Sequence, residues 1–299
     1  MKITARTYLF VAPLLFALAG GCRKPGPIEL TVDQPALQFI APTSSTYLLS
    51  TADIDTLGYF PQIEETATSH LLLAASEFDA FNSHHEAILA RALFLNPSAR
   101  IILAQDTVYR SLEAGTLALD LLVLRKIDKK YRNPVTTRDT VVGSQYALYA
   151  VDGIGGGGIS YDSGRVYEWT GSGSASTPRF TGSMTAPTKI HLTSPDERRL
   201  YPVSTNLSLR WTGGGDTVRL VVRDWDGVKP GKTEFQIQLV NTNETSISRQ
   251  VLGILPVNQG KFLFTLYSSS TAWVQPTGFS APMLVQTITA HNLVVQVKP

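Results

Sequence analysis

Two histidines and a glutamate stand side by side at positions 84–86, and imidazole and carboxylate groups are ligands that transition metals bind in proteins. Adjacent side chains on a strand point to opposite faces. His84 and His85 could therefore share one metal ion only from a loop, with His70 or an acid from elsewhere as a further ligand. We expect no metal site and no cofactor here.

Two other motifs begin like ligand loops but lack essential residues. Asp224, Asp226 and Gly227 start like a calcium loop, yet Phe235 and Gln236 stand where the final bidentate Glu is needed. A tight hairpin turn at Asp226-Gly227 is the better interpretation. The run GIGGGG at 153–158 lacks the Lys-Ser/Thr of a phosphate loop, which favours a flexible hairpin loop.

Catalytic chemistry finds little support in the sequence. No Gly-x-Ser-x-Gly motif occurs, although Gly171-Ser172-Gly173-Ser174 comes close to it in a low-complexity stretch. Sugar hydrolysis needs only two carboxylates, and 24 acidic residues leave that alternative open. We expect a protein that is not an enzyme.

Aromatic and cationic side chains supply the candidate binding residues. Trp211 lies on the apolar register of its segment and is expected in a core. Trp225 falls on the opposite register with Arg223, and the two could offer a flat ring beside a planar donor. Trp273 lies in the polar run SSSTAW. Trp225, Arg223 and Trp273 are the candidate ligand-binding residues, for a glycan or a protein.

The elements that position these residues are predicted to be short β-strands. After residue 188, apolar residues alternate with polar ones in strand-length runs separated by turns. These runs are 206–211, 217–225, 234–239, 247–252, 261–267, 283–288 and 292–297. About seven strands in about 110 residues are typical of a β-sandwich.

Two segments carry a family resemblance: IHLTSP at 190–195 and NLSLRWTGGG at 206–215. They resemble the immunoglobulin-like and fibronectin type III-like modules of extracytoplasmic bacterial lipoproteins. The resemblance implies a sandwich at 189–299 that serves as a spacer or binding module, and it brings no active-site residue. We expect this module to fold by itself.

Residues 46–188 are predicted to form a first sandwich, with a looser resemblance to transthyretin-like domains. The segment 83–95 is ambiguous, because Ser83 and Glu86 form a capping-box pattern while strand-like runs flank it. We favour a strand and leave the helix open. Acidic residues outnumber basic ones by 17 to 13 over 22–188, whereas basic residues lead by 11 to 7 over 189–299. This shift supports a boundary near residue 188.

The first 22 residues have the order of a secretory signal: basic Lys2 and Arg6, a 12-residue apolar run, and small residues before Cys22. As a helix the run spans only about 18 Å, too short for a bilayer. With Ala19-Gly20-Gly21 directly before the single cysteine, the segment resembles the lipobox of bacterial lipoproteins. The resemblance implies cleavage after residue 21, lipid on Cys22, a tether with a first strand over 22–45, and, because Arg23 follows, the outer membrane on either its periplasmic or its outer side.

The overall expectation is an all-β protein of two β-sandwich domains behind a cleaved lipoprotein signal peptide. The formal net charge of +2 gives no basic surface of the kind that gathers nucleic acid phosphates. We expect a non-enzymatic, membrane-anchored envelope protein that presents or binds a partner, either a protein or a glycan. A polysaccharide-binding or polysaccharide-processing lipoprotein is the alternative.

Overall fold

The computed structural model describes residues 38–39, 48–49, 54–55, 58–60, 63–64, 69–81, 83–103, 106–132, 138–215, 217–256, 260–277, 279 and 281–299. The predicted signal peptide, Cys22 and most of the predicted tether lie outside these residues. Residues 36–299 form one compact unit.

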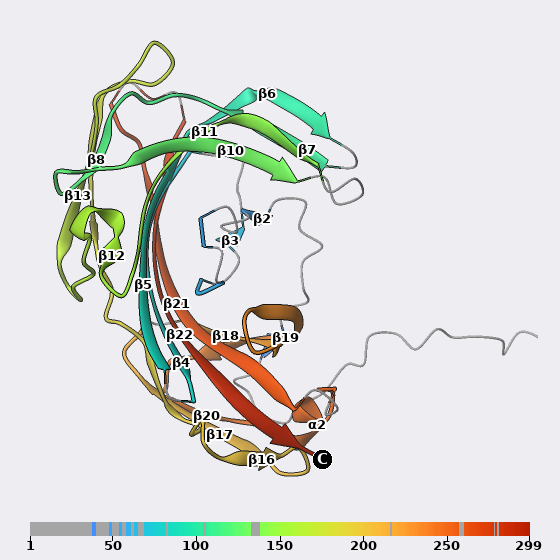
Figure 1. Ribbon diagram of the computed structural model, residues 1–299. Helices are drawn as coiled ribbons and strands as arrows, with labels where there is room; N and C mark the ends of the chain where they lie inside the picture. Colours follow the sequence, from blue (N-terminus) through green and yellow to red (C-terminus); the bar gives the residue numbers. More distant parts are fainter. Residues whose placement is uncertain are drawn as a thin grey trace, which may run out of the picture. The chain divides into compact units, whose positions relative to one another are not determined.

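Most of the described part of the chain is β-strand, with very little helix (Figure 1). The long strands are β4 (His70–Ala80), β5 (Ser83–Leu93), β6 (Leu95–Leu103), β10 (Arg125–Arg132), β11 (Asp139–Val151), β18 (Thr217–Trp225), β19 (Pro230–Val240), β21 (Lys261–Val274) and β22 (Met283–Lys298). The shorter ones are β1 (Gln38–Phe39), β2 (Leu48–Leu49), β3 (Ile63–Glu64), β7 (Asp106–Ser111), β8 (Leu117–Leu119), β9 (Leu122–Val123), β12 (Ile154–Gly155), β13 (Val166–Gly171), β14 (Phe180–Thr185), β15 (His191–Ser194), β16 (Leu200–Pro202), β17 (Leu207–Thr212) and β20 (Glu244–Ile247). Short helical turns occur at η2 (Gly156–Gly158) and α2 (Arg249–Leu252), and no helix among the described residues is long and apolar enough to cross a membrane. The predicted all-β class is confirmed.

One eleven-stranded sheet runs through both halves of the chain. Its main path is β1-β19-β18-β21-β22-β4-β5-β11-β10, with β12 and β16 attached to β11 and β22. The halves meet where β22 lies parallel to β4, from the pair Leu284 and His70 to the pair Leu293 and Asp79. Figure 1 shows β21, β22, β4 and β5 side by side as the centre of this sheet.

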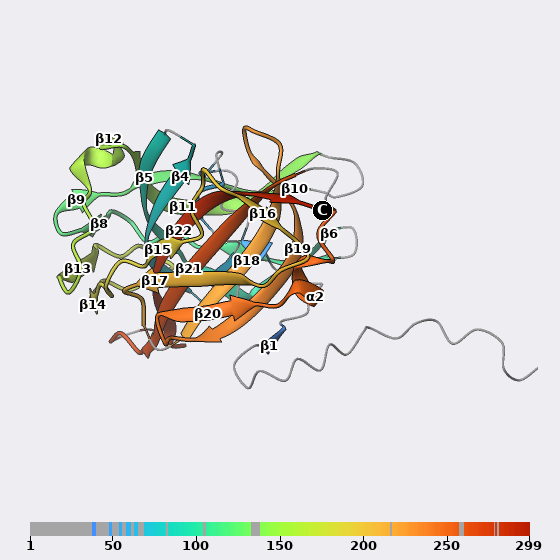
Figure 2. The ribbon, with the colours of Figure 1, turned by 90° about the horizontal axis from the view of Figure 1, so that it is seen from below.

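Residues 189–299 have the strand order of an immunoglobulin-like sandwich. Strands β15, β17 and β20 form one sheet, and β19, β18, β21 and β22 form the other within the large sheet. In immunoglobulin nomenclature these correspond to A-B-E and C′-C-F-G. Figure 2 shows β17 and β20 lying over the large sheet. Trp211 is buried as predicted, and its Nε1 donates a hydrogen bond to Asn241 Oδ1 at 2.7 Å.

A second layer covers the same face of the large sheet in the first half. The small sheet β14-β13-β8-β9 buries Trp169, Tyr167 and Phe180 against Leu73 of β4 and Leu148 of β11. These residues belong to one apolar core. The first half is therefore also a two-layer β-structure.

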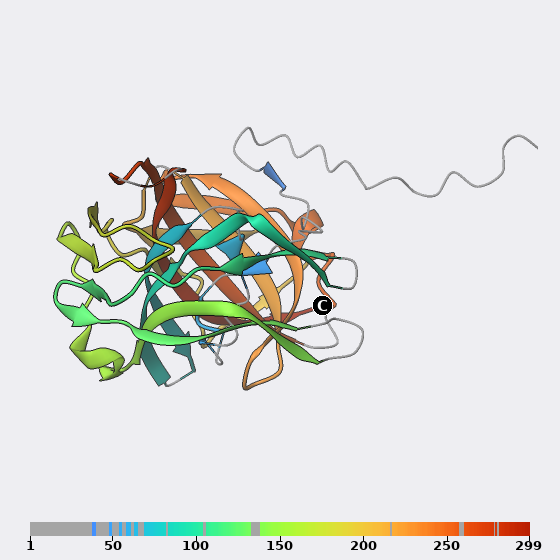
Figure 3. The ribbon, with the colours of Figure 1, turned by 90° about the horizontal axis from the view of Figure 1, so that it is seen from above.

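The opposite face of the large sheet is buried as well. Its core takes Leu72 and Leu89 from the first half and Leu263 and Ile288 from the second, and Phe60 from the segment before β4 belongs to it too. The β6–β7 hairpin lies further along, beside β11 (Figure 3). Gly143 of β11 approaches the backbone of Ser111 there. A Cβ on Gly143 would clash with that backbone.

These pairings correct the expected division near residue 188. Residue 188 lies in the connection between β14 and β15. However, β22 and β4 continue one sheet across it, and a shared apolar core includes residues of both halves. The two sandwiches share a sheet and do not form separate bodies.

Several local predictions are confirmed, and two are corrected. Residues 83–93 form strand β5, and Asp226 Oδ1 accepts the N–H groups of Val228 and Lys229 in a tight turn. The run 247–252 ends strand β20 and continues as helix α2. The runs 283–288 and 292–297 are one strand, β22, because the polar residues between them are buried and paired with β21.

Candidate functional site

Trp273 is the most exposed of the three predicted binding residues, with 58% of its surface accessible. It lies near the end of β21, beyond the part of that strand that pairs with β18. Residues 269–274 pair only with β22 among the described strands. Trp273 therefore presents its ring at a sheet edge that no described strand covers.

Trp225 and Arg223 do not form the open pair that the sequence indicated. The Trp225 ring packs on Phe78 with centroids 5.3 Å apart. Arg223 Nη2 donates to Thr265 Oγ1 at 3.0 Å, and burial lowers the pKa of its guanidinium to about 10. The alternation in β18 marked this face as polar, but Gly58 O accepts a hydrogen bond from Arg223, and Tyr59 and Phe60 belong to the apolar core on this face.

A histidine–carboxylate cluster, which the sequence did not reveal, lies where the two halves meet. Four of the five histidines are hydrogen-bonded to carboxylates. The pairs are His84 with Asp79, His85 with Asp152, His191 with Glu77, and His291 with Asp79. Three of these histidines, His84, His191 and His291, gather around Glu77 and Asp79 on β4; we call these five residues the junction cluster.

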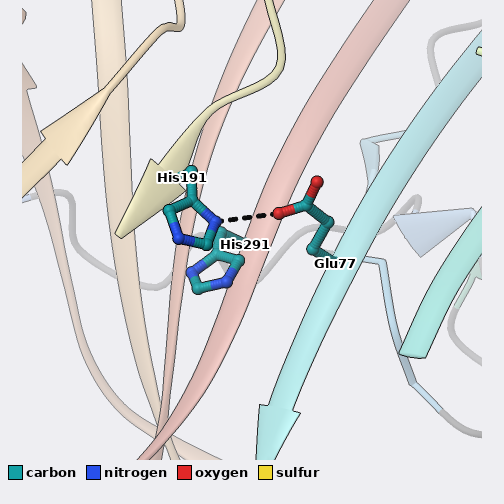
Figure 4. A group of neighbouring side chains, drawn as sticks. All are labelled: Glu77, His191 and His291. Atoms are coloured by element: carbon teal, nitrogen blue, oxygen red, sulfur yellow. Dashed lines mark hydrogen bonds and ion pairs between the residues drawn. The ribbon is translucent and has the colours of Figure 1, made fainter. Parts of the chain in front are cut away.

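Strand pairing explains how the junction cluster assembles. Glu77 lies opposite His291 in the parallel pair of β4 and β22, and Asp79 lies opposite His84 in the β4–β5 hairpin. Directly opposed residues share a face of a sheet. His191, at the start of β15, reaches the same face from the layer above it (Figure 4).

Short hydrogen bonds hold the junction cluster together. His191 Nδ1 and Glu77 Oε2 are 2.9 Å apart, and the rings of His191 and His291 have centroids 4.3 Å apart. Asp79 bridges His84 and His291 at 2.6 and 2.9 Å. The hydrogen bond from His291 lowers the pKa of Asp79 to about 2, and the hydrogen bond to Asp79 raises the pKa of His84.

Glu77, His191 and His291 offer possible ligand atoms within 4.8 Å of one another, so we asked whether they fit a metal ion. His291 Nδ1 accepts the backbone N–H of Leu192 at 3.1 Å. A neutral imidazole has one acceptor nitrogen, so its proton lies on Nε2, which donates to Asp79. His291 therefore has no free lone pair, and two remaining ligands are too few for a zinc site.

The sequence analysis considered His70, His84 and His85 as possible metal ligands, but the histidines that converge in the structure are His191 and His291. His70 lies at the other end of β4, seven residues from Glu77, or about 23 Å along a strand. Burial lowers its pKa to about 3, so it is neutral. The residues that do converge, His191 and His291, are far apart in sequence. The only local signal was a lone histidine within the apolar strand β22.

Comparisons with known proteins do not name a family. No protein-family model and no curated protein matches the chain. Among solved structures, it is similar to a chimeric titin Z1Z2-Z1Z2 tandem functionalised with a GRGDS exogenous peptide from fibronectin. The sequences are 10% identical, 77% of this chain and 100% of that chain are covered, and the TM-score is 0.16. Such a score carries no argument, so the fold assignment rests on the strand pairings.

Proposed function

We propose that this chain is a lipid-anchored, non-enzymatic envelope protein that binds or presents a partner through its β-sandwich layers. The observation that carries the binding role is Trp273, an exposed aromatic ring on an unpaired sheet edge. Exposed aromatic side chains at interfaces contribute much of the binding energy. An unpaired edge can also accept a strand from another chain.

The anchor is proposed from the sequence around Cys22. A lipid on that residue would attach the folded unit to a membrane through the predicted tether. Arg23 follows the cysteine, and by the lipoprotein resemblance this residue directs the protein to the outer membrane. Acyl chains in combination bind membranes firmly, whereas a single chain binds only marginally.

We expect Cys22→Ser to release the protein from washed membranes and to abolish labelling with palmitate, because no other cysteine can take the lipid. Fractionation and labelling of wild type and variant measure this. An unchanged near-ultraviolet circular dichroism spectrum serves as the folding control. A variant that still pellets with membranes after a high-salt wash would contradict the anchor.

We expect Trp273→Ala to weaken capture of a partner at least tenfold, because the ring is the main exposed anchor at this edge. Purified protein would be incubated with a detergent extract of envelope proteins and, separately, with purified cell-surface polysaccharide. Val228→Ala, at an exposed apolar residue on the β18–β19 turn, is the matched control.

The two probes separate the main proposal from its alternative. An aromatic ring also stacks on sugar rings, so Trp273-dependent binding of polysaccharide would favour a polysaccharide-binding lipoprotein. Trp273-dependent capture of an envelope protein would support the protein partner. Equal effects of Trp273→Ala and Val228→Ala would contradict a binding role for this edge.

A further inference from the structure

Polar contacts join the start of β15 to the large sheet at three residues, Lys189, His191 and Leu192. Lys189 pairs with Glu86 of β5, His191 bonds to Glu77 of β4, and the Leu192 N–H donates to His291 Nδ1 of β22. The first two attach the immunoglobulin-like layer to strands of the first half. The third attaches it to its own partner sheet.

The third contact depends on the protonation of His291. The side chain of His291 is fully buried, Nδ1 accepts from Leu192, and Nε2 donates to Asp79. An imidazolium has a proton on both nitrogens and accepts no hydrogen bond. A proton on Nδ1 would therefore face the Leu192 N–H across 3.1 Å, donor against donor.

We propose that His291 is a pH-operated latch between β15 and the shared sheet. With His291 neutral, the latch is closed and Leu192 is bonded. Uptake of a proton at Nδ1 opens the latch and frees the Leu192 N–H, while Nε2 keeps its bond to Asp79. This inference is independent of the proposed function, because it concerns how two layers of the fold are joined.

Several charged or titratable groups face the ring of His291. They are Glu77 and Asp79 on β4, His84 and Glu86 on β5, and Lys189 and His191 at the start of β15; Leu266, opposite on β21, does not titrate. The Glu77 and Asp79 carboxylates favour the imidazolium. His191 opposes it when charged, because its ring centroid is 4.3 Å away. His191 keeps its bond to Glu77 in either state, so His291 alone must lose a bond on protonation.

The measurement is amide hydrogen exchange at Leu192 in the full chain between pH 8 and pH 5.5, corrected for intrinsic exchange. This window covers the range in which imidazoles ordinarily titrate. We expect Leu192 to exchange at least tenfold faster at the acid end. Leu209, buried in β17, is the internal reference and should change less than twofold.

Two variants test the sign of the coupling without altering His291. His191→Gln keeps a donor for Glu77 but removes a competing charge, so it should move the midpoint of the Leu192 change to higher pH. Glu77→Gln removes an anion beside His291 and should move it to lower pH. The matched control is His85→Gln, because His85 bonds to Asp152 on the opposite face of the sheet.

The proposal fails if Leu192 protection, relative to Leu209, is the same at pH 8 and pH 5.5. It also fails if His85→Gln shifts the midpoint as much as His191→Gln, because the pH response would then come from outside the junction cluster. Opposite shifts for His191→Gln and Glu77→Gln, with none for His85→Gln, would establish the latch.

Discussion

Both faces of the large sheet are buried, and this burial changes the pKa of polar side chains within it. His70 illustrates this, since it is buried between Leu93 of β5 and Leu284 of β22 in the strand register. Burial and the positive charge of Arg91 both oppose a proton on its ring, and together they lower its pKa to about 3. The unfolded chain binds that proton near the ordinary value of about 6.5.

This difference predicts that stability falls as the pH is lowered from about 6.5 toward 3. In that window the unfolded state holds one proton more than the folded state, which costs about 1.4 kcal/mol per pH unit. We expect His70→Leu to reduce the slope by one proton. Urea unfolding at pH 7 and pH 4.5, for wild type and variant, measures it, and the carboxylates common to both proteins cancel in the comparison. Equal slopes would mean that folded His70 takes up a proton in this range.

Arg223 and Trp225 show why a residue's exposure could not be taken from alternation alone. Their register is opposite that of the buried Val218 and Leu220, as the sequence indicated. Alternation separates the two faces of a strand but does not say whether the second face meets water. Here Gly58 accepts a hydrogen bond from Arg223, and Trp225 packs on Phe78.

At the scale of elements, short apolar runs predicted the presence of strands better than they predicted where the strands begin and end. The segment 83–93 is a strand although Ser83 and Glu86 match a capping box, because β4 pairs with it over 83–93 and β11 over 87–92. Tertiary pairing outweighs such a local helix signal. Residues 96–98 lie within β6, at an irregularity of the β6–β7 register between Leu95 and Arg100, and Asn96 Oδ1 accepts the Ser98 N–H there at 3.0 Å.

Strand β22 is the element that sequence reasoning described least well. The two predicted runs left a gap at residues 289–291, which contains Thr289 and His291, and the second run began at Asn292. All three residues are buried, and the side chains of His291 and Asn292 are hydrogen-bonded; Asn292 Nδ2, for example, donates to Tyr59 O and Ser76 Oγ at 2.7 Å. Buried polar residues that find partners do not break a strand.

At the scale of the whole molecule, the shared sheet makes the two halves depend on each other. Without residues 1–188, β22 would lose β4 from Leu284 to Leu293, and Leu263 and Ile288 would lose part of their core. An unpaired apolar edge promotes association. The earlier expectation of an autonomous module at 189–299 therefore needs revision.

We expect the fragment 189–299 to self-associate and to melt at a lower temperature than the full chain. Gel filtration and thermal unfolding of both proteins measure this. Ile288→Lys is the matched variant, since it should improve the solubility of the fragment but destabilise the full chain, where Ile288 is buried. A monomeric fragment with the melting temperature of the full chain would show that the shared sheet adds no stability.

The amino-acid sequence by itself determined the all-β class, most strands after residue 189 and the burial of Trp211, because all of these follow from local alternation and turn residues. Only the tertiary structure decided that β22 pairs with β4, that the second face of β18 is covered, and that His191 and His291 meet beside Glu77. Those outcomes depend on which strand edges and apolar faces find each other across more than a hundred residues. Single-strand periodicity carries no information about that choice.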